Sequence, residues 1–182
     1  MKLKFLLSLI LTFSITNTFA VDYYVSALNG SDSNNGLTSN TAFRTIQKAA
    51  NLTNPGDFVY IMNGTYSETK VLFSIHASVL YISRSGNANA YITYKNYPGH
   101  KPKISGVNCR WNCVRIRANY IRFEGIELEG PTQNITYEEA RAMYDYYVTT
   151  PPANRDWNLL GTMNTNGLSL GGDMISSVPW HH

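Results

Sequence analysis

The chain has 182 residues, of which 43% are hydrophobic, 13% aromatic and 15% charged, and its formal net charge is +3. This length and apolar content suffice for one domain with a buried core, and they exclude disordered and collagen-like chains.

Residues 1–20 have the pattern of a secretory signal peptide. Two lysines precede an apolar run that ends at Ile15, and Thr18 and Ala20 occupy the two positions that a signal peptidase reads. The run is too short to span a bilayer and no second one follows, so we expect a secreted protein, extracellular or periplasmic, without a transmembrane segment. Removal of the signal peptide takes away two of the 15 basic residues and leaves 13 against 12 acidic ones. A chain so close to neutral has no overall positive field that would attract nucleic acid.

Two cysteines, Cys109 and Cys113, stand with three residues between them. In an oxidising compartment this spacing favours a disulfide that closes a small loop, and a reduced structural pair is the alternative. A metal site would need two further ligands nearby.

The first elements of the mature chain alternate between strand and helix. We expect a strand over Val21–Ser26, a surface loop over Asn29–Gly36 because nearly all its residues are turn formers, and a helix over Thr45–Leu52 with Thr45 as its N-cap. The turn residues Asn54–Asp57 end that helix, and a strand follows over Phe58–Met62.

From there the chain produces short β segments without crossover helices. These lie around Val71–Phe73, Val79–Ser83, Tyr91–Lys95, Lys103–Ser105, Val114–Arg117, Tyr120–Glu124 and Ile126–Glu129. Strands without such helices exclude a doubly wound α/β fold and leave a sandwich, a barrel or a solenoid.

Repeated apolar spacing favours the solenoid. Ile82, Ile104 and Ile126 stand 22 residues apart, and Ile92 and Val114 are offset by the same 22. A period in the twenties is typical of coils that stack on their neighbours.

Alternation along the chain predicts which side chains face the core. The expected inward residues are Val114, Ile116, Ile121, Phe123, Ile126 and Leu128, and Gly125 shifts the register by one residue before the last two. We expect a tight corner at Ala118–Asn119, since Asn tolerates left-handed backbone angles.

The period breaks in a stretch that behaves as an insertion, from Pro131 to Asn166. Thr136 and Glu139 predict a capping box for a helix that runs through Tyr147. Strand character resumes at Leu168–Leu170, and the chain ends inside what looks like another rung.

The expected organisation is therefore one all-β domain, a parallel β-helix with a short N-terminal capping helix and a partly helical insertion. Its parts are a cap over about 21–57, coils over about 58–130, an insertion over about 131–166 and a further coil over 167–182. We expect this to be the N-terminal part of a longer domain.

Several runs resemble the N-terminal cap and first coils of secreted right-handed parallel β-helix proteins of the pectate-lyase-like superfamily. They are Tyr23–Val25, Gly30–Gly36, Ala42–Ala50, Pro55–Ile61 and Gly64–Tyr66 for the cap and first coil, and Ile92–Gly99 with Pro102–Gly106 for the next rung. The resemblance implies carbohydrate-active ancestry, in which the same cap precedes lyases, glycoside hydrolases and epimerases.

The resemblance also implies a chemistry for the longer parent. Lyases of the superfamily cleave by β-elimination, in which a Lys or Arg base removes a proton and calcium held by acidic oxygens neutralises the uronate carboxylate. No residue of this chain matches that base, so no catalytic position is assigned, and calcium is an expectation from resemblance alone.

Three outward arginines are the first candidates for substrate binding. Arg115, Arg117 and Arg122 would pair bidentately with the carboxylates of an acidic polysaccharide. The alternative is a solvated ladder of ion pairs with the glutamates at positions 124, 127 and 129.

Other candidates lie toward the end of the chain. Tyr144 and Trp157 belong to an aromatic group in the insertion that would stack on sugar rings or pack onto the coil. Asp173 is the best calcium ligand by position, with turn capping as the alternative. Together these features predict a secreted protein that acts on or binds acidic polysaccharide. A non-catalytic binding or surface-structural module and an inactive fragment are the alternatives, and the oligomeric state is open.

Overall fold

The computed structural model describes residues 19–67, 78–107, 112–130, 135–156 and 166–170. Within these ranges ten strands pair in parallel as three sheets. Sheet 1 contains β1 (Asp22–Val25), β2 (Phe58–Ile61), β5 (Ile92–Asn96) and β8 (Ile121–Glu124). Sheet 2 contains β3 (Gly64–Ser67), β6 (Pro102–Ser105) and β9 (Glu127–Glu129). Sheet 3 contains β4 (Leu80–Ile82), β7 (Asn112–Ile116) and β10 (Asn166–Leu170).

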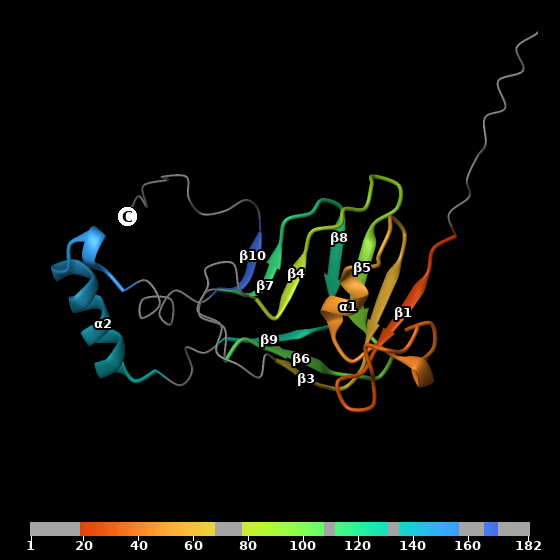
Figure 1. Ribbon diagram of the computed structural model, residues 1–182, viewed down its shortest axis with the longest axis horizontal. Helices are drawn as coiled ribbons and strands as arrows, with labels where there is room; N and C mark the ends of the chain where they lie inside the picture. The colour runs from red at the N-terminus through yellow and green to blue at the C-terminus, as the bar shows by residue number, and fades with distance from the viewer. Residues whose placement is uncertain (1–18, 68–77, 108–111, 131–134, 157–165, 171–182) are drawn as a thin grey trace, which may run out of the picture.

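From β2 onward the chain visits sheets 1, 2 and 3 in the same order again and again (Figure 1). Each strand hydrogen-bonds to the strand that occupies the same place one coil earlier or later. The predicted all-β class and parallel β-helix architecture are confirmed. β3 was not expected from sequence, and the strand expected over Val71–Phe73 lies outside the described residues.

The predicted period of 22 residues is wrong. Ile82 lies on β4 in sheet 3 and Ile104 lies on β6 in sheet 2, so they do not hold equivalent places. The true partner of Ile82 is Ile116, 34 positions along, and the partner of Ile104 is Leu128, 24 positions along. Coil length varies because the turns between strands differ in length, whereas stacking fixes only the strand register.

The core lies between the three sheets and takes inward residues from each. Its fully buried members include Val59 and Tyr94 from sheet 1, Ile104 from sheet 2, and Leu80 and Val114 from sheet 3. The predicted inward positions on β8 are confirmed, since Ile121 and Phe123 pack against this core while their neighbours are exposed. Burial raises the pKa of the Tyr94 hydroxyl to about 12.

A short helix covers the N-terminal end of this core. Helix α1 (Ile46–Ala50) begins after the predicted N-cap Thr45, whose side chain accepts the backbone N–H of Lys48. Ile46 and two alanines of the helix are buried. On the same helix, the Gln47 amide donates to the Tyr81 carbonyl at 3.0 Å and accepts the Tyr81 N–H at 2.8 Å. Gln47 therefore completes the free edge of β4 as a neighbouring strand would.

The corner before β8 differs from the prediction by one residue. Tyr120, and not Asn119, has the left-handed backbone angle, with φ of 57°. Gly125, between β8 and β9, has φ of 66°, which is the backbone change expected where the register shifts.

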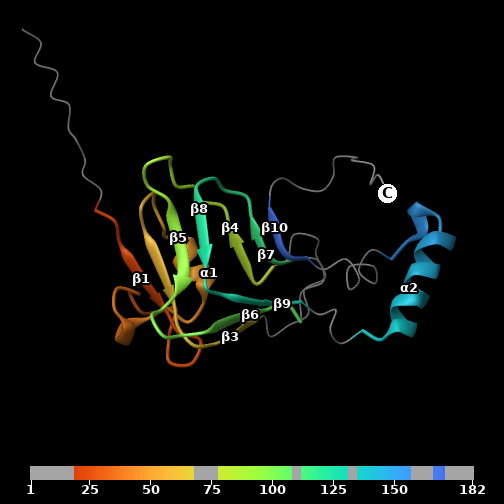
Figure 2. The same cartoon turned by 180° about the vertical axis from the view of Figure 1, so that it is seen from behind.

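The insertion contains helix α2 (Tyr137–Thr149), and the predicted capping box of Thr136 and Glu139 is confirmed. No residue of α2 is buried, and the helix lies apart from the labelled strands in both views (Figures 1 and 2). Two single-turn 3-10 helices, Ser39–Thr41 and Pro152–Asn154, complete the described elements. None of the described helices has the length and apolar character that crossing a membrane requires.

Candidate functional site

The outer face of sheet 1 carries aromatic and charged side chains, with the buried Thr93 among them. Alternate residues of a strand point to opposite faces of the sheet. Val59 and Tyr94 point inward, so the residues on either side of them point outward and form two rows across the strands. One row consists of Asp22, Phe58, Thr93 and Arg122, and the other of Tyr24, Tyr60, Lys95 and Glu124.

Four aromatic side chains on this face form what we call the aromatic platform: Tyr24, Phe58, Tyr60 and Tyr97. Tyr60 lies at its centre, stacked on Tyr24 with ring centroids 5.6 Å apart and on Phe58 at 6.0 Å. Tyr97, just after β5, meets Tyr60 edge-on at 6.3 Å. All four rings are half-buried, so they support one another and still present surface to solvent.

Charged side chains lie on both sides of the aromatic platform. The pKa of Tyr60 is raised above its ordinary value, first by burial and then by the nearby carboxylate of Asp22, so Tyr60 stays a neutral hydroxyl donor. Lys95 lies opposite Tyr60 in the register, and its Nζ is 3.7 Å from Glu124. The Lys95 and Glu124 side chains are 35% and 50% exposed, so their attraction is weak and the lysine can exchange partners.

A second cation lies on β8. The exposed guanidinium of Arg122 stands over the ring of Tyr91, 4.8 Å from its centroid. Tyr91 in turn meets Tyr120 edge-on at 5.6 Å. The ring holds the guanidinium in place and leaves its N–H groups for hydrogen bonds.

A histidine supports the far edge of the platform. His100 packs edge-on against Tyr97 at 5.1 Å, and its Nδ1 accepts the backbone N–H of Asn63 at 2.9 Å. The Asn63 side chain accepts the Lys101 N–H at 2.6 Å, so the turns of two coils are joined behind the ring. His100 therefore positions Tyr97.

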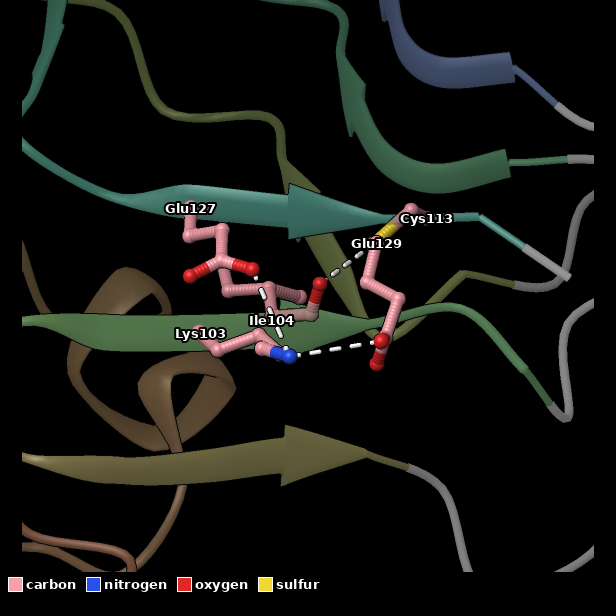
Figure 3. A network of polar contacts seen from close by, with 5 residues as sticks. All are labelled: Lys103, Ile104, Cys113, Glu127 and Glu129. Carbon is pink, nitrogen blue, oxygen red and sulfur yellow. Dashed lines mark hydrogen bonds and ion pairs between the residues drawn. The ribbon is translucent and has the colours of Figure 1, made fainter. Parts of the chain in front are cut away.

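The outer face of sheet 2 holds a different cluster (Figure 3). The Lys103 Nζ lies 3.3 Å from Glu127 and 3.2 Å from Glu129. Hydrogen bonding to Glu129 and then to Glu127 raises the pKa of Lys103 above its ordinary value. A lysine held protonated in this way is a fixed cation and a poor general base.

The three predicted arginines do not share one groove. Arg115 is 7% exposed and lies over the Tyr81 ring at 5.6 Å, so it cannot line an open surface, and that part of the prediction is wrong. Burial follows from its central place in sheet 3, where β4 and β10 flank it. Arg117 is exposed just after β7 on sheet 3, whereas Arg122 lies on sheet 1.

The glutamates of the predicted ladder pair with lysines. Lys95 lies beside Glu124, and Lys103 beside Glu127 and Glu129. These pairs join neighbouring coils within one sheet, as expected for the ladder, with lysines as the cations.

The remaining candidates stay predictions. Tyr144 lies on α2 and is 57% exposed, away from the aromatic platform. Trp157, Asp173 and Cys109 lie outside the described residues, so neither the calcium ligand nor the disulfide is tested. The Cys113 sulfur is buried and lies 3.3 Å from the carbonyl oxygen of Ile104, visible in Figure 3.

Metal binding is not supported within the described part of the chain. No three His, Cys, Asp or Glu side chains gather there to hold an ion, and calcium requires six to eight oxygen ligands. A pocket of about 380 Å³ beside α1, lined by Arg44, Gln47 and Thr65 among others, shares no residue with the aromatic platform.

Sequence reasoning missed the aromatic platform. Phe58 and Tyr60 occupy the outward positions of a strand whose inward positions are Val59 and Ile61, and this alternation is visible in the sequence. Tyr24 becomes part of the set only through the pairing of β1 with β2, which sequence spacing does not reveal.

The fold and this face define the class of protein. Parallel strands stacked as three sheets under an N-terminal cap make a parallel β-helix, and sheet 1 carries aromatic rings and cations on its outer face. The Pel9A-like right-handed β-helix region matches residues 23–173, and the chain belongs to this carbohydrate-active family.

The chain is also similar to individual proteins, each over part of its length. The uncharacterized protein YwoF of Bacillus subtilis (strain 168) is 32% identical over 131 residues, which cover 69% of this chain and 25% of YwoF. A solved rhamnogalacturonan lyase is 26% identical with a TM-score of 0.54, covering 62% of this chain and 29% of that one. A lacto-N-biosidase of family GH136 from Eubacterium ramulus is 19% identical with a TM-score of 0.47, over 60% of this chain and 20% of that one. The chain thus spans about a quarter of the curated relative.

Proposed function

We propose that the chain belongs to a secreted protein that binds an acidic polysaccharide along the outer face of sheet 1. The observation that carries this proposal is the aromatic platform beside Lys95 and Arg122 on one parallel sheet. The flat rings would stack on sugar faces, and the two cations would pair with uronate carboxylates.

Spacing along the sheet suits a polymer. Parallel strands lie about 4.8 Å apart, so the outward positions from β1 to β8 extend over roughly 14 Å, enough for two or three sugar rings. Rings dominate on β1 and β2 and charges on β5 and β8, which gives the bound polymer a direction.

The parent protein is proposed to be a polysaccharide lyase or hydrolase. Family membership and the likeness to rhamnogalacturonan lyase support carbohydrate processing. Calcium, with Asp173 as a ligand, and contributions from Arg117, Tyr144 and Trp157 belong to this proposal. The second candidate function is binding without turnover by this part of the chain. It is favoured because Lys103, the outer cation of sheet 2, is paired with two glutamates and is therefore a poor general base.

Affinity electrophoresis in gels that contain polygalacturonate, alginate or uncharged xylan tests the proposal. We expect retardation by an acidic polymer that weakens with salt, and loss of most of it in Tyr60→Ala. Tyr137→Ala, on α2 and 74% exposed, is the matched control and should bind as the unaltered chain does. Equal retardation of both variants would place binding elsewhere, and no retardation by any polymer would refute the proposal.

Turnover is measured separately. The same polymers are incubated with the protein and calcium, and the ultraviolet absorbance of the unsaturated uronate product is followed. Product formation supports a lyase, whereas binding without product supports the non-catalytic module.

A further inference from the structure

The carboxylate of Asp57 is the most deeply buried acidic group of the described chain, with 1% of the residue exposed. One oxygen accepts the backbone N–H of Asn54 at 2.7 Å and the other accepts the N–H of Val21 at 2.8 Å. No lysine, arginine or histidine of the described ranges forms an ion pair with it. A buried carboxylate held only by neutral N–H groups is costly, because burial removes the water that would stabilise its charge.

The Val21 N–H that contacts Asp57 belongs to the residue directly after the expected signal-peptide cleavage point. Val21 directly follows Ala20, where the export signal predicts cleavage. Ala20 is exposed and Val21 is half-buried, so the bond between them lies where the chain enters the fold. The Val21 carbonyl accepts the N–H of Phe58 at 3.0 Å, which fixes Val21 at the start of the pairing between β1 and β2.

We infer that hydrolysis of the Ala20–Val21 bond completes the fold by placing the new α-ammonium group of Val21 against the carboxylate of Asp57. Water supplies a hydroxyl to the Ala20 carbonyl, which leaves as a carboxylate, and the freed Val21 amine takes up a proton. The neutral N–H donor 2.8 Å from Asp57 thereby becomes a cation without any movement of the backbone. The buried charge gains a counterion, and the ion pair ties the N-terminus to the turn before β2.

No other described group near Asp57 can act as the cation that pairs with its carboxylate. Arg84, from the turn after β4, donates to the Thr53 carbonyl and to the Asn54 side chain, which are neutral acceptors. Burial raises the pKa of the Tyr23 and Tyr94 phenols, the charge of Asp57 raises both further, and the charge of Arg84 opposes the rise. Tyr94 is fully buried in the core. None of these groups provides a cation in contact with the carboxylate.

The first test determines where the mature chain begins. The protein is expressed with its own first 20 residues, recovered from the periplasm or medium, and its N-terminus is identified by mass spectrometry. We expect Val21 as the first residue, and any other start would overturn the inference. This outcome does not depend on the polysaccharide proposal, because no polymer takes part in the measurement.

The second test compares chains that start at Val21 and at Ala20, released from a removable fusion that leaves no extra residue. The chain with Ala20 keeps the N–H donor of Val21 and moves the charge one residue away, so it is the matched control. At pH 7 we expect the Tm of the Val21 chain to be higher by about 3 °C or more. Equal Tm values would overturn the inference.

The substitution Asp57→Asn and a change of pH make the test specific. When both chains carry Asp57→Asn, the two starts should have the same Tm, since no buried charge remains to be paired. A free α-amine has a pKa of about 8, and pairing raises it, so the advantage should be complete below pH 8 and vanish at higher pH as the amine loses its proton. An advantage that survives the substitution or the high pH would contradict the ion pair.

A chemical measurement decides the matter even where Asp57→Asn does not fold. Reductive methylation of the α-amine at pH 8 should be about fivefold or more slower for the Val21 chain than for the Ala20 chain, because a free α-amine is about half unprotonated at this pH and a raised pKa lowers that reactive fraction. Equal rates would overturn the inference.

Discussion

The coils and helix α2 are stabilised by different kinds of interaction. The coils bury side chains from all three sheets, and their contacts join residues that are far apart in the sequence, such as Leu80 and Val114. Helix α2 buries no residue, and its described bonds are local: the capping box at Thr136 and the pair of Arg141 with Asp145 at 3.4 Å. The coils therefore derive stability from burial and α2 from local helix chemistry, and the two should respond to different substitutions.

A substitution that removes volume from the core should give the largest difference in stability loss between the coils and α2. Leu80 is fully buried on β4, so Leu80→Ala should lower the free energy of unfolding by about 2–5 kcal/mol. Val148→Ala, on α2 and 52% exposed, should change it by no more than about 0.5 kcal/mol. Urea denaturation measures both, and comparable losses would show that α2 belongs to the same cooperative unit as the coils.

The corner between β8 and β9 gives the next largest effect. Gly125 has a left-handed backbone angle, and an added Cβ would overlap the Asn96 side chain, so Gly125→Ala should cost about 2–3 kcal/mol. Gly99 has φ of 79° but open space around it, and Gly99→Ala should cost only about 1 kcal/mol. Thermal unfolding compares them, and equal losses would mean that Asn96 moves aside freely.

Loss of the Gln47 contact should be smaller. Gln47→Leu keeps the volume but removes both hydrogen bonds to Tyr81, which should cost about 1–3 kcal/mol. Gln47→Glu keeps an acceptor for the Tyr81 N–H and should therefore cost less. Hydrogen exchange at the Tyr81 amide should be faster in the leucine variant, and unchanged exchange would rule out the proposed completion of the β4 edge.

The smallest effect is expected at the start of α2. Glu139 accepts the backbone N–H and the hydroxyl of Thr136, which lowers the pKa of its carboxyl. The lowered pKa means that the contact stabilises α2 above the ordinary carboxyl range near about pH 4.3 and is lost as pH falls below it. NMR of the α2 amides should show fraying at low pH, absent in Glu139→Gln, while the coil signals stay unchanged. Fraying that is the same in both chains would contradict this.

Local chemistry explains what could be predicted from sequence. The N-cap at Thr45, the capping box at Thr136 and the alternation on β8 each depend on residues close in the chain, and all three are confirmed. The 22-residue period failed because turn length, and not strand spacing, sets the length of each coil. The burial of Arg115 was missed for a similar reason, since it depends on two strands paired from distant segments.

The candidate site shows the same limit. Outward arginines were recognised by residue type, but which sheet each one faces is decided by long-range pairing, so only Arg122 lies beside the aromatic platform in sheet 1. The β3 strand was missed because Gly64 and Ser67 have weak strand preference, and pairing with β6 imposes the conformation.

Binding offers the most direct comparison of the two regions, because each presents exposed tyrosines. The protein is titrated with oligogalacturonate, the acidic ligand of the proposal, and the ring signals of its assigned tyrosines are followed by NMR. The account predicts shifts for Tyr24, Tyr60 and Tyr97 that are larger than any shift of Tyr144 on α2. Shifts at Tyr144 with an unchanged aromatic platform would contradict it.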